Sequence, residues 1–216
     1  MAGITWDVLG ASGVIEPGHH VLASGNHAPE KAELEVLAAN RGLLLGASYG
    51  MANLALRELG PELDFIVTVG EGANAYRPDI VDFYNLFSRD KKPRVKVARG
   101  VETSYTIIDG QKDFFVKPEY LDAIKSPKSN KIGVFEDVLT RYTNSGLVSQ
   151  LLAGMGFEVV GIVAILNSGG FGHVTGKPEI KGHALVNHKM IDHKPDACPQ
   201  CKAGEPITEK SSKLAA

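Results

Sequence analysis

The chain has 216 residues, a mass of 23.1 kDa and a formal net charge of −2 at pH 7. This length suits one domain, or a core with a small appendage, and the 44% of hydrophobic residues suffices for an ordinary globular core. The near-neutral charge argues against a nucleic-acid partner and against a membrane surface. With no visible signal peptide, no membrane-length apolar run and only two cysteines, we expect a cytoplasmic protein.

Helical and strand patterns alternate along the chain. Residues 10–28, rich in Gly, His and Ser, are expected to be irregular, whereas Pro29 suits the first turn of a helix that runs to Gly42. A second, buried helix is expected over residues 43–60. The remaining expectations are strands at 64–70, 94–98, 131–135 and 157–166, helices within 73–87 and over 146–156, and a mobile excursion at 100–129. This alternation predicts an α/β fold with a mostly parallel twisted sheet flanked by helices.

Two adjacent carboxylates, Glu136 and Asp137, follow the third of these strands. A loop rich in hydroxyl and amide groups comes next, and then an apolar helix. Ligands of open α/β sheets collect at the carboxyl ends of the strands, where this pair falls. Carboxylates can accept hydrogen bonds from ribose hydroxyls, and a helix N-terminus can bind phosphate. The alternative interpretation is an acidic strand end before an ordinary helix-capping loop.

The residues EDVLTRYTNSG (136–146) resemble the phosphoribosyl-diphosphate motif of type I phosphoribosyltransferases. Four further segments are similar, in order, to the orotate phosphoribosyltransferase branch: ASGNHAPEKAE, VTVGEGAN, GFEVVGIVAILNSGG and CPQCKAGEPI. The resemblance implies a hood segment at 1–28, a phosphoribosyltransferase-like core at 29–180 and a C-terminal tail at 181–210. Residues 211–216, SSKLAA, resemble the remnant of an expression vector.

The resemblance implies transfer of ribose 5-phosphate from phosphoribosyl diphosphate to a nucleobase, with release of pyrophosphate. It also implies Mg²⁺ as cofactor, a homodimer, and a place in nucleotide metabolism such as pyrimidine biosynthesis. The implied catalytic residues are Glu136, Asp137, Arg99 and Lys112. The implied ligand-binding residues are Thr140, Arg141, Tyr142, Thr143 and Asn144 for the 5-phosphate, Gly70, Glu71, Gly72 and Ala73 for pyrophosphate, and Ser24, Gly25, His27 and Ser168 for the base.

The sequence departs from the family pattern in several places. Arg141 and Tyr142 replace small residues of the phosphate loop, and Glu71 places an anion where pyrophosphate would bind. Asn167–Ser168 stands where orotate enzymes carry Asp-Arg, and Ala23 where they commonly carry Lys. The base is therefore open: orotate, another pyrimidine or a purine. The second hypothesis is a regulatory protein of the same fold that binds a nucleotide or phosphoribosyl diphosphate without turnover.

A lone CxxC, Cys198 and Cys201, raises a third option, a zinc-stabilised interaction module. The other ligands would be drawn from His183, His188 and His193, whose offsets are irregular, and we assign no metal ligand from the sequence. Three more histidines lie near the N-terminus, where they fit either base recognition or an ordinary loop: His19, His20 and His27.

Overall fold

The computed structural model describes residues 3–22, 24–91, 97–124, 131–170, 172–174 and 177–208. Ala23, most of the strand expected at 94–98 and the segment 211–216 lie outside these residues. The N-terminal elements are α1 (Trp6–Ala11), β1 (Ile15–Val21), β2 (His27–Ala32), α2 (Leu34–Ala39) and α3 (Arg41–Glu58). The central elements are β3 (Phe65–Thr68), α4 (Gly70–Asn74), α5 (Arg77–Lys91), β4 (Arg99–Ile108), β5 (Gln111–Val116) and α6 (Leu121–Ile124). The last are β6 (Lys131–Leu139), α7 (Thr143–Gly154), β7 (Glu158–Asn167), β8 (His173–Val174), β9 (Lys177–Asn187) and α8 (Pro199–Lys202).

The main sheet has seven strands among the described residues, in the order β5-β4-β3-β6-β7-β9-β8. Its five inner strands pair in parallel, and only the edge strands β5 and β8 pair antiparallel. This arrangement confirms the α/β fold with a mostly parallel sheet. Because the inner strands are parallel, their carboxyl ends lie along one edge of the sheet.

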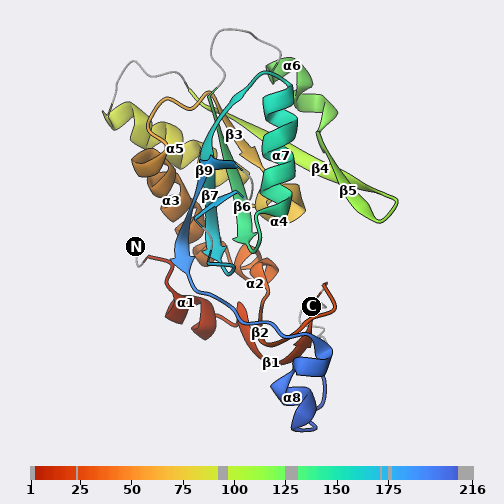
Figure 1. Ribbon diagram of the computed structural model, residues 1–216. Coiled ribbons are helices and arrows are strands. Elements are labelled where there is room, and N and C mark those ends of the chain that lie inside the picture. The colour runs from red at the N-terminus through yellow and green to blue at the C-terminus, as the bar shows by residue number, and fades with distance from the viewer. Residues whose placement is uncertain are drawn as a thin grey trace.

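Helices cover both faces of this sheet, α3 and α5 on one side and α7 on the other (Figure 1). Alternate residues of β7 point to opposite faces, as the period of two in a strand requires. Val163 and Ile165 join the core under α3 and α5, whereas Ile162 and Ala164 join the core under α7. None of the described helices is long and apolar enough to cross a membrane.

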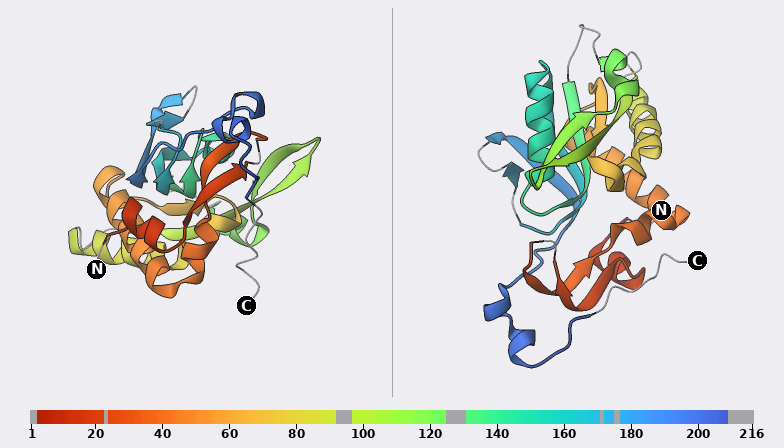
Figure 2. Two further views of the ribbon diagram at one scale, coloured as in Figure 1. Left: turned by 90° about the horizontal axis from the view of Figure 1, so that it is seen from below. Right: turned by 90° about the vertical axis from the view of Figure 1, so that its right-hand side faces the viewer.

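The N-terminal strands form a separate two-stranded sheet, and the C-terminal tail lies against it (Figures 1 and 2). Strands β1 and β2 pair antiparallel, from Ile15 opposite Ala32 to Val21 opposite His27. The backbone of His193 in the tail pairs with His27, which extends this small sheet by one bridge. Two segments about 165 residues apart in sequence thus share backbone hydrogen bonds.

Three expectations about local structure were wrong. Residues 10–28 are not irregular, because they contain β1, and Pro29 lies in β2 rather than in a helix, which begins only at Leu34. Strand pairing thus overrides the weak local propensities there. The third is the excursion expected at 100–129, which contains the β4–β5 hairpin. Asp109 and Gly110 turn this hairpin with positive φ angles of 50° and 76°, and Asp-Gly is the sequence signal for such a turn.

Candidate functional site

The parallel register brings three predicted segments to the same edge of the sheet. Thr68 at the end of β3 lies opposite Phe135, next to the acidic pair on β6. On the other side of β6, Glu136 lies opposite Ala164, and Leu139 lies opposite Asn167 at the end of β7. The loop after β3, the carboxylates of β6 and the loop after β7 therefore adjoin one another.

A cavity of about 360 Å³ opens where these segments meet. It is lined by the loop after β3, the acidic pair, Asn144 of α7 and Lys112 of β5. Besides Tyr105, the ionisable residues that line the cavity are Glu33, Glu35, Glu71, Glu136, Asp137 and Lys112. One lysine faces five carboxylic acids, so the cavity is suited to a ligand that brings positive charge, such as a metal-bound anion or a cationic sugar ring.

Burial dominates the electrostatics of the acidic pair. Glu136 is only 5% exposed, and this burial raises its pKa to about 7, with Asp137 nearby adding to the shift. Ser145, Asn144 and Lys112 oppose it. Burial also raises the pKa of Asp137, whose Oδ1 accepts a hydrogen bond from the Val138 N–H at 2.8 Å. Both carboxyl groups would thus gain from a cation in the cavity.

The predicted pyrophosphate loop, Gly70 to Ala73, forms the first residues of the short helix α4. Gly70 has φ of 67°, a conformation that favours glycine. A methyl group built on Gly72 would overlap the Asp137 carboxylate. Glu71 is exposed at the mouth of the same cavity, whereas Ala73 is buried. The backbone of this loop can approach a ligand closely because two of its four residues have no side chain.

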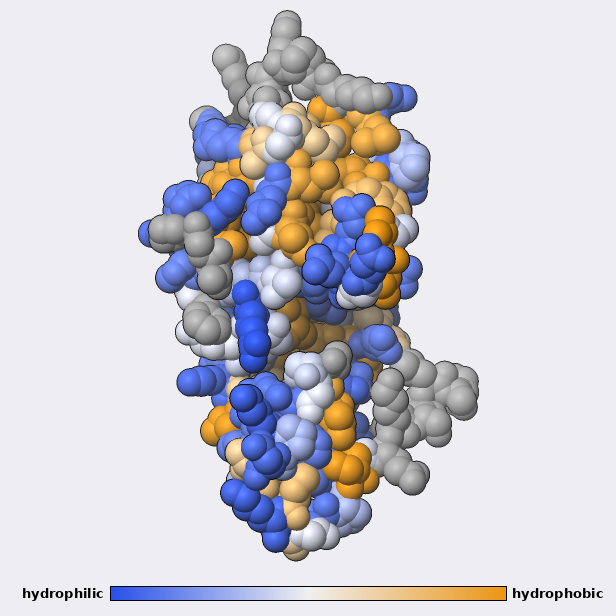
Figure 3. Space-filling view, turned by 45° about the vertical axis from the view of Figure 1, so that its right-hand side comes forward, coloured by the Kyte–Doolittle hydropathy of each residue, from blue (hydrophilic) through white to orange (hydrophobic). Residues whose placement is uncertain are grey.

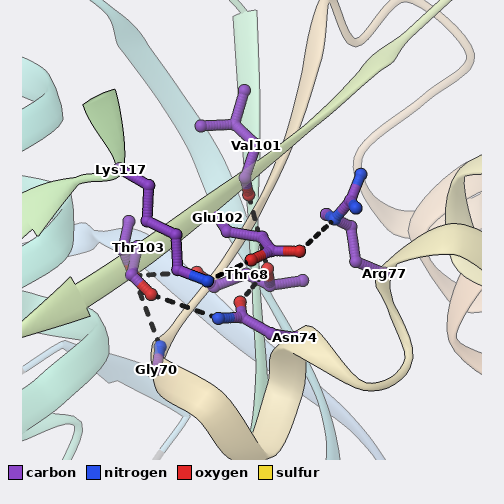
Figure 4. A network of polar contacts seen from close by, with 8 residues as sticks. All are labelled: Thr68, Gly70, Asn74, Arg77, Val101, Glu102, Thr103 and Lys117. Atoms are coloured by element: carbon purple, nitrogen blue, oxygen red, sulfur yellow. Dashed lines mark hydrogen bonds and ion pairs between the residues drawn. The ribbon is translucent and has the colours of Figure 1, made fainter. Parts of the chain in front are cut away.

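Polar contacts fasten the predicted pyrophosphate loop to β4 (Figure 4). The Gly70 N–H donates to Thr103 Oγ1 at 3.3 Å, and Thr103 Oγ1 donates to the Thr68 carbonyl at 2.8 Å. Asn74 Nδ2 donates to the Thr103 carbonyl at 3.3 Å. The loop is therefore held from both of its ends by one threonine.

Glu102 anchors the neighbouring hairpin in the same network (Figure 4). Its carboxylate accepts from Arg77 Nε at 2.9 Å and pairs with Lys117 Nζ. Burial acts to raise the pKa of Glu102, but these two cations outweigh it and lower that pKa. Glu102 therefore joins the start of α5 and the residue after β5 to β4.

The predicted 5-phosphate loop separates into three environments. Thr140 and Arg141 line a second cavity, described below, and Thr143 and Asn144 begin α7. Tyr142 adopts a left-handed conformation (φ 58°, ψ 21°), and its ring, 2% exposed, packs over Gly182 of β9. Tyr142 provides no side-chain cap to α7, so the first N–H groups of this 12-residue helix can bind an anion.

The second cavity, of about 590 Å³, lies between the main sheet and the N-terminal sheet. Its walls come from β2, the loops after β6 and β7, and the tail, with apolar, acidic and basic side chains mixed. Figure 3 shows a recess at this level, with hydrophobic surface inside it. Ala32 and Val138 line both cavities, so the two adjoin. Basic side chains in the lining are Lys31, Arg141 and Lys189.

The predicted base-binding residues are only partly brought together here. Ser168 lines the larger cavity, and its Oγ donates to the Leu139 carbonyl at 3.3 Å. Ser24 and Gly25 form the turn between β1 and β2, outside the lining of both cavities. His27 Nδ1 faces Cys201 Sγ at 3.2 Å instead. Three charged residues of the lining had not been predicted as binding residues: Lys31, Lys189 and Glu30.

The two predicted catalytic cations, Arg99 and Lys112, lie far apart in the structure. Lys112 lines the smaller cavity, with its Nζ 4.3 Å from the centre of the Tyr105 ring. Arg99 begins β4 opposite Phe65, the first residue of β3, and its guanidinium lies over the Phe65 ring. That is the opposite edge of the sheet from the cavity, so one chain does not bring Arg99 to the acidic pair.

The chain folds into an open α/β sheet, and two loops and an acidic pair lie at its carboxyl edge, where ligands of such sheets collect. No protein-family model matches the chain. It is 26% identical over 212 residues to an orotate phosphoribosyltransferase of Carboxydothermus hydrogenoformans, covering 91% of this chain and 90% of that relative.

Two solved structures share the fold. One is orotate phosphoribosyltransferase from Aeropyrum pernix, with a TM-score of 0.61 at 14% identity, covering 84% of this chain and 92% of that one. The other is adenine phosphoribosyl transferase from Trypanosoma brucei, with a TM-score of 0.54 at 14% identity, covering 95% and 86%. The chain has the type I phosphoribosyltransferase fold, and its sequence is distantly similar to orotate phosphoribosyltransferases. The resemblance inferred from the sequence is confirmed at this level.

Proposed function

We propose that the protein is a phosphoribosyltransferase that transfers ribose 5-phosphate from phosphoribosyl diphosphate to a nucleobase and releases pyrophosphate. One observation carries this proposal. A single cavity is lined by the glycine loop after β3, the acidic pair of β6, Lys112 and the start of α7. These are the groups that a sugar carrying a pyrophosphate and a phosphate requires, and they come from four separate segments of the chain.

In the proposed reaction the bond between the ribose C1 and the pyrophosphate oxygen breaks, a nitrogen of the base bonds to C1, and the proton of that nitrogen passes to solvent. Positive charge develops on the sugar ring during this step. Glu136 and Asp137 would accept hydrogen bonds from the ribose hydroxyls and stabilise that charge. The loop at Gly70 and Gly72 would bind the pyrophosphate through its backbone, and Lys112 would offset its negative charge.

Mg²⁺ fits the donors of this cavity, because carboxylate oxygens are ligands that the ion accepts. Glu71 and Asp137 are the side chains we propose to hold it, and when bound it would offset the charge of the leaving pyrophosphate. The acidic excess of the lining supports this assignment, since pyrophosphate alone would be repelled by the surrounding carboxylates.

Pyrophosphate release from phosphoribosyl diphosphate and Mg²⁺, measured across orotate, uracil, adenine, guanine and hypoxanthine, tests the activity. Asp137→Asn should abolish release while the protein stays folded by circular dichroism. Glu158→Gln is a matched control, because Glu158 is exposed at the other end of the sheet. Unchanged turnover in Asp137→Asn would refute the role assigned to that carboxylate.

A regulatory protein that binds the same ligand without turnover remains the second candidate. The placement of Arg99 at the far edge of the sheet favours it, because the acidic pair then lacks one of the two predicted catalytic cations. Calorimetry with phosphoribosyl diphosphate and with nucleoside monophosphates separates the two. Tight binding with no pyrophosphate release from any base would establish the second candidate and overturn the first.

The homodimer implied by the family resemblance stays a prediction. Arg99 can take the proposed catalytic role only if it reaches the cavity of a partner subunit. Light scattering of the purified protein measures the oligomeric state. Mixing Arg99→Ala with Asp137→Asn protein should restore activity in hybrid dimers if the role is exercised across the interface.

A further inference from the structure

Two histidines and two cysteines converge below the main sheet: His19 of β1, His27 of β2, and Cys198 and Cys201 of the tail. One ligand atom from each lies within 4.8 Å of all the others. No other group of three or more potential metal-ligating side chains lies so close together among the residues that the structure describes. The group is separate from both cavities, since no member lines either one.

The interatomic distances match a tetrahedral metal site. Cys198 Sγ and Cys201 Sγ each lie 3.5 Å from His19 Nε2, and Cys201 Sγ lies 3.2 Å from His27 Nδ1. Zinc bonds of typical length at tetrahedral angles separate sulfur from nitrogen by roughly 3.5 Å. His19 Nε2 and His27 Nδ1 are 2.9 Å apart, so the two rings need to separate by only a few tenths of an ångström.

The orientation of His19 is fixed for ligation. Its Nδ1 lies 2.9 Å from the carbonyl oxygen of Glu205, which can only accept a hydrogen bond. The proton therefore sits on Nδ1, and Nε2 presents its lone pair to the two sulfur atoms. Histidine ligands of metals commonly have such an outer hydrogen bond to a carbonyl.

We propose that His19, His27, Cys198 and Cys201 form a structural Zn²⁺ site. Ligation by two thiolates releases two protons to solvent and gives the site no net charge. That suits its half-buried position, since His19 is 3% and Cys198 1% exposed, while His27 is half-buried and Cys201 is exposed. All four positions of the tetrahedron are taken by protein, so the site holds the metal without opening it to a substrate.

The site would fasten the tail to the N-terminal sheet. Other contacts run along the same seam: Thr208 N–H donates to the His19 carbonyl at 2.7 Å, and His27 and His193 exchange two backbone hydrogen bonds. A two-stranded sheet is marginal by itself, so a metal cross-link to the tail adds stability where the hydrophobic core adds little. Both joined segments supply walls of the larger cavity, through Ala28 and Ile191 among others.

Metal analysis of the purified full-length chain tests the proposal directly. We expect about one zinc per chain in the wild type and less than about a tenth of that in Cys198→Ser and Cys201→Ser. His183→Ala is the matched control and should retain the zinc, because His183 Nδ1 faces Glu58 rather than the cysteines. Absence of zinc from the wild type after expression in zinc-supplemented medium, or full retention by both serine variants, would overturn the proposal.

Two measurements on the unaltered chain guard against variants that fail to fold. Cobalt exchanged for zinc should give the thiolate-to-metal absorption and visible bands of a tetrahedral site with two sulfur ligands. Both thiols should resist alkylation until a chelator is added, and the chelator should lower the melting temperature. Octahedral cobalt bands, or a Cys198–Cys201 disulfide in freshly purified protein, would refute the site. None of these readouts depends on phosphoribosyltransferase activity.

Discussion

Gly72 and Asp137 touch at the point where the glycine loop after β3 meets the strand β6. A Cβ atom at residue 72 would overlap the Asp137 carboxylate, so the loop and the acid can adjoin only because residue 72 has no side chain. In the proposed reaction this contact lies between the group that binds pyrophosphate and the group that binds ribose. The distance between residue 72 and Asp137 therefore determines whether the loop can bind the pyrophosphate while Asp137 binds the ribose.

Gly72→Ala should reduce pyrophosphate release about tenfold or more, because the methyl group must displace either the loop or the Asp137 carboxylate. The measurement is kcat/KM for phosphoribosyl diphosphate. Gly154→Ala is the control: it lies at the end of α7, nothing lies within 4 Å of its added methyl group, and activity should not change. Wild-type kinetics in Gly72→Ala would show that the contact does not matter to the reaction.

Lys112→Ala should lower kcat by roughly a hundredfold, since it removes the lysine from an otherwise acidic cavity lining. Lys112→Arg should recover part of the loss because it keeps the charge. The exposed Lys91, at the end of α5, serves as the control for a general change in charge. If Lys112→Ala keeps full activity with the best base, the lysine takes no part in catalysis.

The buried carboxyl of Glu136 predicts a pH-dependent stability. Its pKa is raised from 4.5 to about 7 in the folded protein, so between these values the folded state binds more protons than the unfolded state. The contribution of Glu136 to the free energy of unfolding therefore falls as pH rises from 4.5 to about 7, by on the order of 3 kcal/mol. Urea unfolding of the wild type and Glu136→Gln at about pH 5 and about pH 8 measures the difference.

The difference in the free energy of unfolding between the wild type and Glu136→Gln should have a defined sign. Relative to Glu136→Gln, the wild type should lose stability at the higher pH, where its carboxyl is ionised without a ligand. A difference between them that stays constant with pH would contradict the raised pKa. Saturating phosphoribosyl diphosphate with Mg²⁺ should reduce the loss, because cationic charge in the cavity favours the ionised carboxylate.

Glu102→Gln should destabilise the fold by about 1–3 kcal/mol, because Arg77 and Lys117 would lose the carboxylate that pairs with both. Urea unfolding measures the change. Glu58→Gln is the control, since Glu58 pairs with Arg57 at the surface, and little change is expected there. Equal stability of Glu102→Gln and the wild type would show that the network of Figure 4 does not hold the hairpin in place.

Much of the core could be predicted from the sequence because its signals are local. Short β-branched runs such as residues 64–70 and the buried helix at 43–60 show their character within a few residues, and both elements are present. The hairpin at 99–116 was missed, although Asp109–Gly110 signals its turn. The strands β1 and β2 had no such signal, since Pro17, Gly18 and the neighbouring histidines have low strand propensity.

The strand-helix alternation could be predicted from the sequence alone, as could the acidic pair, Glu136 and Asp137, at a strand end before a polar loop. Both features depend on residues that are neighbours in the sequence, so they can be recognised without knowledge of the tertiary structure. Which partners these groups meet depends on long-range packing: Lys112 rather than Arg99 lies beside the acids, and Tyr142 lies inside the core. The fold also brings His19 to Cys198 across 179 residues, because backbone pairing between β2 and the tail, which no local pattern encodes, places these two segments side by side.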